Sequence, residues 1–258
     1  ILEANPGGAP CNVLALLSKM GHKAAFIGKV GKDGFGDQLT AGLKETGIDT
    51  TGLMYDTSVH TTLAVVHTFA DGDRDFSFYR NPGADMMLKS DEVNEEIIAN
   101  SKIFHFGSLS MTDEPVRSAH LHALDVAEKN GVLRSYDPNL RPPLWPDLDT
   151  AKENTLALMS HCDILKISDN EIQWFTGLED FDECIRVLQD TYHIPLILLS
   201  MGRDGSRAYY RGMRVEAAPF LQKNTIETTG AGDTFFGSVL HHILEKGFRP
   251  YTKEELDE

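Results

Sequence analysis

Short apolar segments alternate with amphipathic helical segments along most of this chain, and this alternation restricts its fold more than any other feature. The strand-like runs cover residues 24–27, 103–106, 132–136, 164–167 and 196–199. The helical patterns cover residues 13–20, 35–46, 116–130, 151–160 and 182–190. Strands and helices that alternate in this way form a parallel sheet with helices packed on both faces. The sequence therefore predicts a three-layer α/β/α fold around a mostly parallel central sheet.

One region departs from this pattern. Residues 61–69 and 75–79 are rich in strand-forming residues and flank Asp71-Gly72-Asp73, which is a hairpin signal. We expect a small β-sheet here, around residues 48–82, that stands outside the main sheet as a lid. A chain of 258 residues can otherwise bury one large core, so we expect a single domain over residues 1–258.

The charge and the cysteine content exclude several classes of function. The formal net charge of −15 argues against nucleic acid and against an anionic membrane as partners. No apolar run is long enough to span a bilayer. The three cysteines are widely separated, and no spacing of cysteine or histidine matches a metal site. These residues indicate a cytoplasmic protein in a reducing environment.

The segment Gly230-Ala231-Gly232-Asp233 reads as a loop that becomes a helix, because apolar residues at helical spacing follow it. Thr228 and Thr229 are candidates for the N-cap. Small residues at a helix start allow backbone N–H groups to approach an anion closely, and the helix dipole favours that anion. An acid at the same place suits a base that takes a proton from a hydroxyl attacking the bound phosphoryl group. The alternative is an ordinary helix start with Asp233 as a surface acid, worth ~0.3–1 kcal/mol.

Residues 227–233, Glu-Thr-Thr-Gly-Ala-Gly-Asp, resemble a signature of the ribokinase (PfkB) family of sugar kinases, which usually has Asp where this chain has Glu227. The resemblance implies that the amides of Gly230, Ala231 and Gly232 form an anion hole for the transferred phosphate. It implies that Asp233 is the catalytic base and that ATP and Mg²⁺ are the cofactors. The residues of this segment that it assigns to the nucleotide are Thr228, Gly230 and Gly232.

A second glycine-rich loop precedes the first predicted helix. Residues 5–12, Asn-Pro-Gly-Gly-Ala-Pro-Cys-Asn, combine paired glycines with Asn12, whose amide offers both a donor and an acceptor. The residues alone leave open a simple turn with Asn12 as its cap. The loop is similar to the sugar-binding loop of fructokinases in the same family, and this resemblance implies that Gly7, Gly8 and Asn12 contact the sugar.

Two further stretches are assigned to the substrate. Residues 28–36 are dense in glycine but match neither the dinucleotide-binding nor the P-loop pattern. Related kinases have a similar stretch, which implies that Gly31 and Asp33 approach the sugar. In the predicted lid, Phe78 and Arg80 alternate onto one face of a strand. The resemblance implies that they close over the substrate, while a solvated lid strand is the alternative.

Residues 137–145, Asp-Pro-Asn-Leu-Arg-Pro-Pro-Leu-Trp, follow a predicted strand, at the edge where open α/β sheets bind ligands. They resemble a stretch of fructokinases and 2-keto-3-deoxygluconate kinases, which implies that Asn139 and Arg141 lie near the substrate or the transferred phosphate. The alternative for Arg141 is an ordinary surface residue.

Two loops after predicted strands are assigned to the nucleotide and the metal. Ser168-Asp169-Asn170-Glu171 is similar to the family's Asn-x-x-Glu motif, with Ser168 in place of Asn. It implies that Glu171 organises water around Mg²⁺. Residues 200–205 look like the family's nucleotide loop. The residues that this loop assigns to the phosphates are Ser200, Gly202 and Gly205.

These motifs, in this order, predict an ATP-dependent kinase that phosphorylates a primary hydroxyl of a hexose, with fructose as the favoured substrate. The alternatives are 2-keto-3-deoxygluconate or another sugar or nucleoside within the family and, in another class, a sugar- or nucleotide-binding homologue without activity. Lids of this family commonly clasp each other, which implies a homodimer through the lid. By the same resemblance, one family strand is expected before Ile1 and a last helical segment after Glu258.

Overall fold

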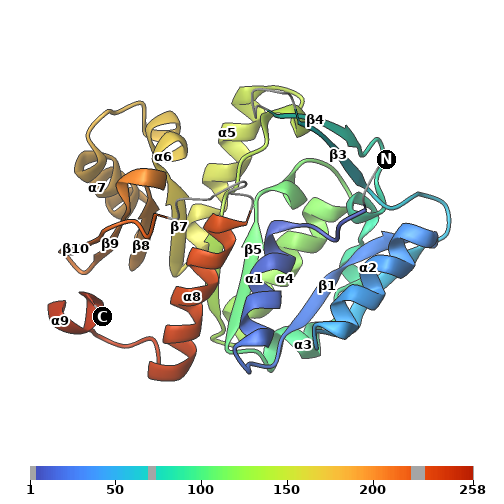
Figure 1. The fold of residues 1–258 in the computed structure, drawn as a ribbon, viewed down its shortest axis with the longest axis horizontal. Helices are drawn as coiled ribbons and strands as arrows, with labels where there is room; N and C mark the ends of the chain where they lie inside the picture. Colours follow the sequence, from blue (N-terminus) through green and yellow to red (C-terminus); the bar gives the residue numbers. More distant parts are fainter. Residues whose placement is uncertain (1–3, 69–73, 222–229, 258) are drawn as a thin grey trace. The chain divides into compact units, whose positions relative to one another are not determined.

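The computed structural model describes residues 4–68, 74–221 and 230–257. Contacts divide the chain into two compact units, Ile1–Asn100 with Ser110–Val126 and Ser101–Leu109 with Ala127–Glu258. We call them the first and the second unit. Figure 1 shows the helices and strands of both, with labels on most of them.

The first unit combines short helices with two small sheets. Its elements are α1 (Ala9–Lys19), β1 (Ala25–Gly31), α2 (Gly34–Glu45), β2 (Asp49–Asp56), β3 (Leu63–Thr68), β4 (Arg74–Tyr79), α3 (Glu95–Ala99) and the first part of α4 (Val116–Lys129). β1 and β2 pair in parallel, with Gly31 opposite Asp56 at their carboxyl ends. Helix α2 makes the crossover that a parallel pair requires.

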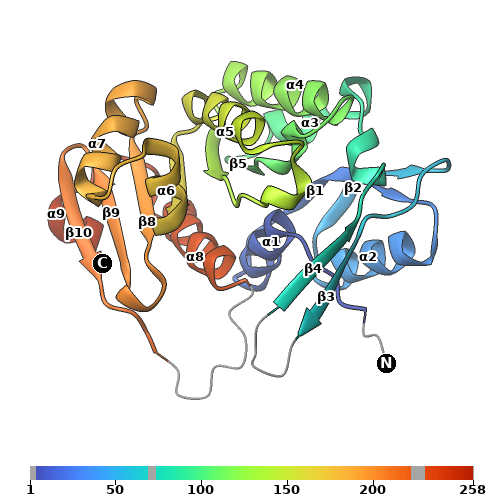
Figure 2. The ribbon, with the colours of Figure 1, turned by 90° about the horizontal axis from the view of Figure 1, so that it is seen from above.

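The predicted hairpin is present in the first unit. β3 and β4 pair antiparallel, with Leu63 opposite Tyr79 and Ala64 opposite Phe78, and they form a sheet of their own (Figure 2). The predicted turn, Asp71-Gly72-Asp73, lies outside the described residues. Within the range 48–82 assigned to the lid, β2 pairs with β1 and not with the hairpin.

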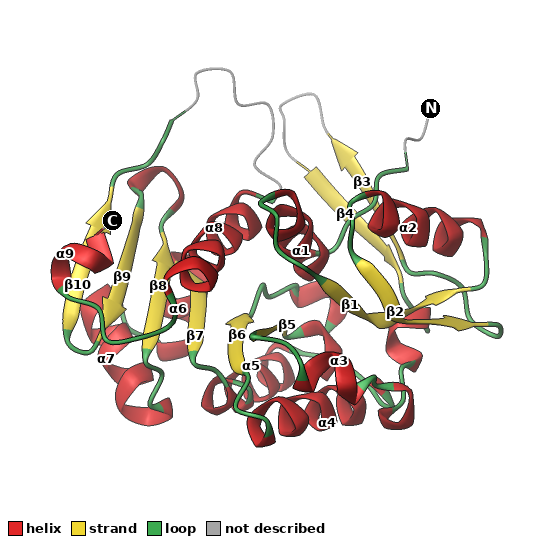
Figure 3. Cartoon of the chain, turned by 90° about the horizontal axis from the view of Figure 1, so that it is seen from below, coloured by secondary structure: helices red, strands yellow, loops and turns green. Residues whose placement is uncertain are grey.

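The second unit is built on one six-stranded sheet with the order β10-β9-β8-β7-β6-β5 (Figure 3). Its strands are β5 (Ile103–Gly107), β6 (Leu133–Asp137), β7 (Ile164–Ser168), β8 (Leu196–Ser200), β9 (Ser206–Tyr210) and β10 (Met213–Ala217). Its helices, after the end of α4, are α5 (Leu148–Ala157), α6 (Asp169–Thr176), α7 (Phe181–Tyr192), α8 (Ala231–Lys246) and α9 (Lys253–Asp257). β5 to β8 are parallel, and β9 is antiparallel to both of its neighbours.

Side chains that alternate along β6 point to opposite faces of this sheet. On one face the hydroxyl of Tyr136 donates to the backbone oxygen of Thr155 in α5 at 3.1 Å. Asp137 points to the other face. On that face, Phe236 of α8 meets the ring of His105 edge-on, with 5.1 Å between the ring centroids. The sheet of the second unit is therefore covered by helices on both sides.

The predicted fold class is confirmed, since the sheet is mostly parallel, helices cover both faces, and a small antiparallel sheet is present. The elements that the sequence did not predict are β2, α3, α6, α9 and the hairpin β9–β10. At the turn of that hairpin, Arg211 and Gly212 both have positive φ, 49° and 77°, as two-residue hairpin turns require. Gly212 was the available signal. Strand β1 also reaches Gly31, well beyond the predicted end at residue 27.

Among the described residues, no helix combines the length and the apolar composition needed to cross a membrane.

Candidate active site

The start of α8 has a glycine where most helices have a polar cap. Gly230 is the N-cap residue, its φ is 78°, and no side chain caps the helix. A positive φ of this size favours glycine over any residue with a Cβ. The N–H groups of the first turn have no partner inside the helix, so this helix start can accept an anion. Thr228 and Thr229 lie outside the described residues, and neither occupies the N-cap, so that expectation was wrong.

Asp233 is the third residue of α8 and is only 7 % exposed. Phe236, Leu240 and Ile243 are buried on the same helix at intervals of four and three residues, which fixes the face that α8 presents to the sheet. A carboxylate in the first turn complements the helix dipole. Its burial sets it apart from a solvated surface acid, which was the alternative from the sequence.

Beside this helix start lies a buried ion pair that the sequence reading did not use. Lys166 of β7 donates to both carboxylate oxygens of Asp137 at the end of β6, at 3.0 and 3.2 Å. Burial raises the pKa of Asp137 to about 6; the Lys166 ammonium lowers it, and the nearby carboxylates of Glu171 and Asp233 raise it. The signal for Lys166 was a charged residue inside an otherwise apolar strand, Ile164-Leu165-Lys166-Ile167.

The loop after β6 is fixed by hydrogen bonds at Pro138 and at Leu140. The hydroxyl of Ser108 donates to the backbone oxygen of Pro138 at 2.6 Å, and the N–H of Leu140 donates to Glu171 at 2.8 Å. Between them, Asn139 has a φ of 45°. The exposed guanidinium of Arg141 donates to the backbone oxygen of Leu140 at 3.0 Å. The structure thus places Asn139 on a fixed turn and Arg141 at the surface beside it.

Glu171 completes a capping box at the start of α6. One carboxylate oxygen accepts the Ser168 N–H at 3.0 Å and the Ser168 hydroxyl at 2.7 Å, and the other accepts the Leu140 N–H. Since both oxygens already accept hydrogen bonds, Glu171 fits a metal site through a bound water better than as a direct ligand. Asp137 lies within electrostatic reach of both Glu171 and Asp233, and oxygen donors of this kind suit a hard divalent cation.

The loop after β8 requires its two glycines for backbone reasons. Gly202 and Gly205 have φ values of 54° and 92°. A Cβ on Gly205 would lie 2.2 Å from the backbone oxygen of Ala217. Ser200 pairs with Ser206 across the β8–β9 ladder. A cavity of about 600 Å³ adjoins this loop, and its charged lining is Asp169, Asp204, Arg207 and Glu216. That mostly acidic lining disfavours phosphate inside this cavity, so the start of α8 is the better site for the transferred phosphate.

In the first unit, the predicted sugar loop leads into α1. Gly8 is the N-cap of α1, its φ is 126°, and no side chain caps this helix either. The N–H of Asn12 donates to the backbone oxygen of Gly8 at 3.0 Å, as part of the helix. Gly7 is exposed, and a Cβ there would meet no atom within 4 Å. Packing within this unit therefore does not explain why residue 7 is a glycine.

The stretch with Gly31 and Asp33 is fixed by contacts with Thr61. A Cβ on Gly31 would lie 2.4 Å from the backbone N of Thr61, so no other residue fits. Asp33 caps α2 by accepting the Gly36 N–H at 2.9 Å, and it also accepts the Thr61 N–H and hydroxyl at 2.9 and 2.8 Å. Burial raises the pKa of Asp33, but the hydrogen bonds from Thr61 and Gly36 outweigh it and bring the pKa to about 2.

A cavity of about 770 Å³ in the first unit brings together three of the predicted sugar contacts. Its lining includes Asp33, Phe78 and Arg80, together with His60 and Gln38, which the sequence reading did not single out. The predicted contacts of the first unit that do not line it are Gly7, Gly8, Asn12 and Gly31.

Arg80 is held by neighbours within the same unit. Its Nε lies 2.7 Å from Asp85, and its Nη1 donates to the hydroxyl of Thr112 at 2.9 Å. The guanidinium at the edge of the cavity is therefore fixed in orientation.

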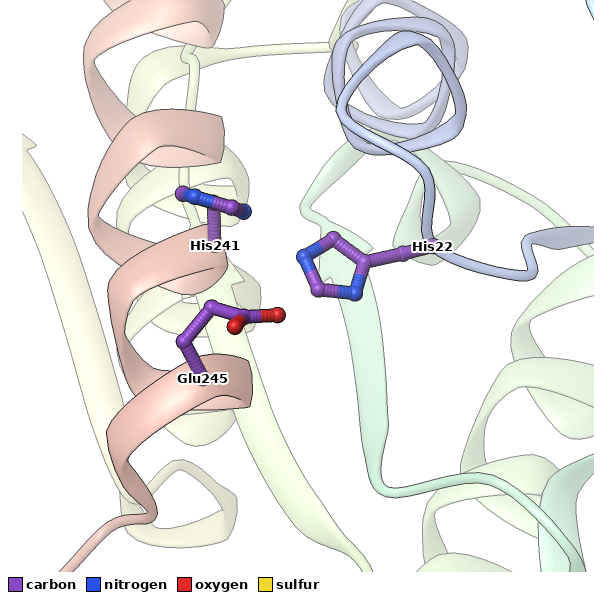
Figure 4. Close-up of side chains that lie close together, drawn as sticks. All are labelled: His22, His241 and Glu245. Carbon is purple, nitrogen blue, oxygen red and sulfur yellow. The ribbon is translucent and has the colours of Figure 1, made fainter.

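Farther along α8, His241 and Glu245 lie one helical turn apart and project from the same side of the helix (Figure 4). Two side chains supply fewer ligand atoms than the four of a structural zinc site. This pair gives no reason to assign a metal to α8.

A family model described as "pfkB family carbohydrate kinase" matches residues 2–254. "Probable fructokinase-4" of Arabidopsis thaliana is 43% identical over 240 residues, which are 93% of this chain and 73% of that protein. "Fructokinase-1" of Oryza sativa subsp. japonica is 40% identical over 253 residues, 98% of this chain and 78% of that protein.

Solved structures agree with these relatives. The fructokinase of Xylella fastidiosa with bound ATP superposes with a TM-score of 0.85 at 30% identity, covering 93% of this chain and 74% of that one. The fructokinase of Vibrio cholerae O395 in its fructose, ADP and calcium ion bound form gives a TM-score of 0.83 at 28% identity, covering 92% and 76%.

Proposed function

The chain belongs to the pfkB family of carbohydrate kinases, and from this we propose that it is a fructokinase, which transfers the γ-phosphate of ATP to a primary hydroxyl of fructose. Relatives at 40–43% identity carry the name fructokinase, and a neighbouring structure holds fructose with ADP. One observation on this chain carries the proposal: a glycine-capped helix start with a buried acid in its first turn.

The chemistry follows from the arrangement of that helix start. Asp233 takes the proton of the sugar hydroxyl, and the oxygen forms a bond to the γ-phosphorus while the bond to the β-phosphate oxygen breaks. ADP leaves with the electron pair of that bond, and the proton stays on the Asp233 carboxylate until solvent removes it. The amides of Gly230, Ala231 and Gly232 stabilise the charge on the transferred group, as preorganised dipoles do in a site that excludes water.

Mg²⁺ bound with ATP supplies positive charge to the phosphates. Glu171 would hold it through water, because both of its oxygens accept hydrogen bonds from Ser168 and Leu140. Ser200, Gly202, Gly205 and Thr228 are the further residues that we assign to the nucleotide.

The sugar contacts are proposed on the first unit and on the loop after β6. Asp33, Phe78 and Arg80 line one cavity, whose charged and aromatic side chains suit a polyhydroxylated ring. Gly7, Gly8, Asn12 and Gly31 precede or flank this region in the sequence, and Asn139 and Arg141 belong to the second unit. Because Asp33 already accepts three hydrogen bonds, its part is to hold Thr61 and the loop beside the sugar.

A coupled assay of ADP release tests the proposal. With MgATP, we expect the kcat/KM for fructose to exceed that for ribose, adenosine and 2-keto-3-deoxygluconate. A higher value for 2-keto-3-deoxygluconate would leave a sugar kinase with another substrate. Absence of ADP release with every sugar, while sugar or nucleotide still binds, would leave a non-catalytic homologue.

We also propose that the protein is cytoplasmic and forms a homodimer through the β3–β4 hairpin. Val66 and Tyr79, on opposite faces of this hairpin by its register, are 47% and 66% exposed, so both faces offer apolar surface to a partner. Light scattering at micromolar concentration should give twice the mass of the chain. A monomer that keeps full activity would refute the dimer and leave the kinase assignment unchanged.

A further inference from the structure

The ion pair between Lys166 and Asp137 lies directly against the start of α8. A Cβ added to Gly232 would come within 3.0 Å of the Lys166 Nζ and within 3.5 Å of its Cε. Ala is preferred over Gly inside a helix by about 1 kcal/mol, so the glycine here gives up helix stability. Because Gly232 has no Cβ, the Lys166 ammonium can lie close to the backbone at this position.

Negatively charged groups outnumber positively charged ones among the strongest electrostatic neighbours of Asp137. Of the charged groups that act most strongly on Asp137, Lys166 is positive, whereas Glu171 and Asp233 are negative. His105, on the same face of the sheet, adds no positive charge at neutral pH, because burial lowers its pKa to about 4. Lys166 is therefore the cation that offsets these carboxylates from inside the sheet.

A contribution to the stability of the fold explains the presence of this buried ion pair poorly. A buried ion pair often contributes nothing relative to apolar residues of the same volume, because removing both charges from water offsets their attraction. Lys166 is 7% exposed and Asp137 is 3% exposed, so both are largely removed from water. A buried charge does act strongly on nearby charges that change during a reaction, since the effective dielectric constant is low.

We propose that Lys166 is a positioning residue. Its ammonium packs against Gly232 and adds positive charge next to the backbone amides that bind the transferred phosphate, while Asp137 holds the ammonium in place. The inference rests on the proposed function, since it assigns the start of α8 to the transferred phosphate. A purely structural link between β6 and β7 is the competing explanation.

Three variants separate these explanations: Lys166→Met, Asp137→Asn with Lys166→Met, and the control Lys29→Met. Lys29 is an equally buried lysine of the first unit, 2.7 Å from Glu92, and has no assigned part in the reaction. All kinetics are measured well below the lowest melting temperature, so that every variant is folded.

Lys166→Met leaves Asp137 unpaired and should lower both the melting temperature and kcat. The double variant removes both charges, so its melting temperature should recover. Its kcat should stay at least about tenfold below that of the parent, since electrostatic support of the transition state is still missing. The KM for fructose should stay within about threefold, because an interaction made in the transition state affects kcat alone. Lys29→Met should lower the melting temperature but keep kcat within about threefold of the parent.

A double variant with kcat within about twofold of the parent would show that the pair is only structural, and so would a loss of kcat in Lys29→Met as large as that in Lys166→Met. Asp233→Asn is measured in the same series. If Asp233→Asn keeps its turnover, the proposed mechanism fails. If it loses turnover while both Lys166 variants match the parent, only the present inference fails.

Discussion

The starts of α2 and α8 look alike in sequence, because each places an acid among glycines where a loop enters a helix, yet the two acids are used differently. Asp33 is the N-cap of α2, and its side chain accepts three hydrogen bonds. Asp233 is the third residue of α8, behind a glycine N-cap that offers no side chain. An acid at the N-cap satisfies helix N–H groups with its own side chain, whereas the glycine N-cap of α8 leaves the N–H groups of the first turn without a capping side chain.

The surroundings of the two helix starts also differ, as the carboxylates of Asp33 and of Asp137 show. The Asp33 side chain is 20% exposed. Burial raises its pKa, but donated hydrogen bonds prevail and hold the pKa at about 2. Asp137, beside Asp233, is almost fully buried, and burial raises its pKa to about 6. The comparison teaches that two acids in similar glycine-rich sequences are distinguished by their burial and by the residue at the N-cap.

The largest expected effect is on catalysis at α8. Asp233→Asn keeps the size and polarity of the side chain but removes the base, so kcat should fall by about 10²–10⁴-fold. The effect on the melting temperature should be much smaller than the effect on kcat, because Asn is close to Asp in size and keeps a polar side chain at the helix start. Steady-state kinetics and thermal denaturation on the same samples give both values. Turnover within about tenfold of the parent would refute Asp233 as the base.

The next effect concerns the glycines before α2. Gly31→Ala should destabilise the protein by about 3 kcal/mol or prevent folding, because the new Cβ would lie 2.4 Å from the Thr61 backbone N. Gly34→Ala is the matched control, since a Cβ there meets no atom within 4 Å and its φ is not positive. Denaturant unfolding measures both. Equal stability of the two variants would mean that this loop is not fixed by Thr61.

A smaller effect is expected from Asp33 itself. Asp33→Ala removes the cap and the acceptor for Thr61, and should cost about 2 kcal/mol at pH 7. Because the folded-state pKa is lowered to about 2, the stabilisation by the carboxylate is complete above the ordinary pKa near ~3.9 and is lost as the pH falls through about 2. The difference between parent and variant should therefore shrink from pH 5 to pH 2 in unfolding experiments.

Asp33→Asn provides the control for that measurement, since Asn also caps helices but keeps one acceptor oxygen only. It should lose less stability than Asp33→Ala. A large rise in the KM for fructose at unchanged stability would instead assign Asp33 a direct contact with the sugar.

The smallest expected effect tests α1, which shares the uncapped glycine start of α8. Gly7→Ala should leave the free energy of unfolding within about 0.5 kcal/mol, because the position is exposed and without close neighbours. If α1 also begins at a ligand, the KM for fructose should rise while stability stays constant. An unchanged KM would remove Gly7 from the predicted sugar contacts.

Much of the fold was predictable from periodicity and helix-end signals. The predicted segments correspond to β1, β3 to β8, α1, α2, α4, α5, α7 and α8. β2 and the β9–β10 hairpin were missed, because their apolar alternation is short. In the candidate site, the motifs point to glycines and acids that are contiguous in sequence, and their roles stay predictions. The motifs do not point to Lys166, His60 and Thr61, because each belongs to the site only through distant contacts.

The sequence by itself determined the alternation of strands and helices, the family, and the run Gly230-Ala231-Gly232-Asp233 at the start of a helix. These depend on residues within one or two helical turns of each other, where spacing and propensity act directly. The tertiary structure alone decided that Asp33 is bound by Thr61, 28 positions away, and that Asp137 is paired with Lys166, 29 positions away. Local patterns place an acid on an element, but burial and hydrogen-bond partners come from packing between elements, and these set its charge and its use.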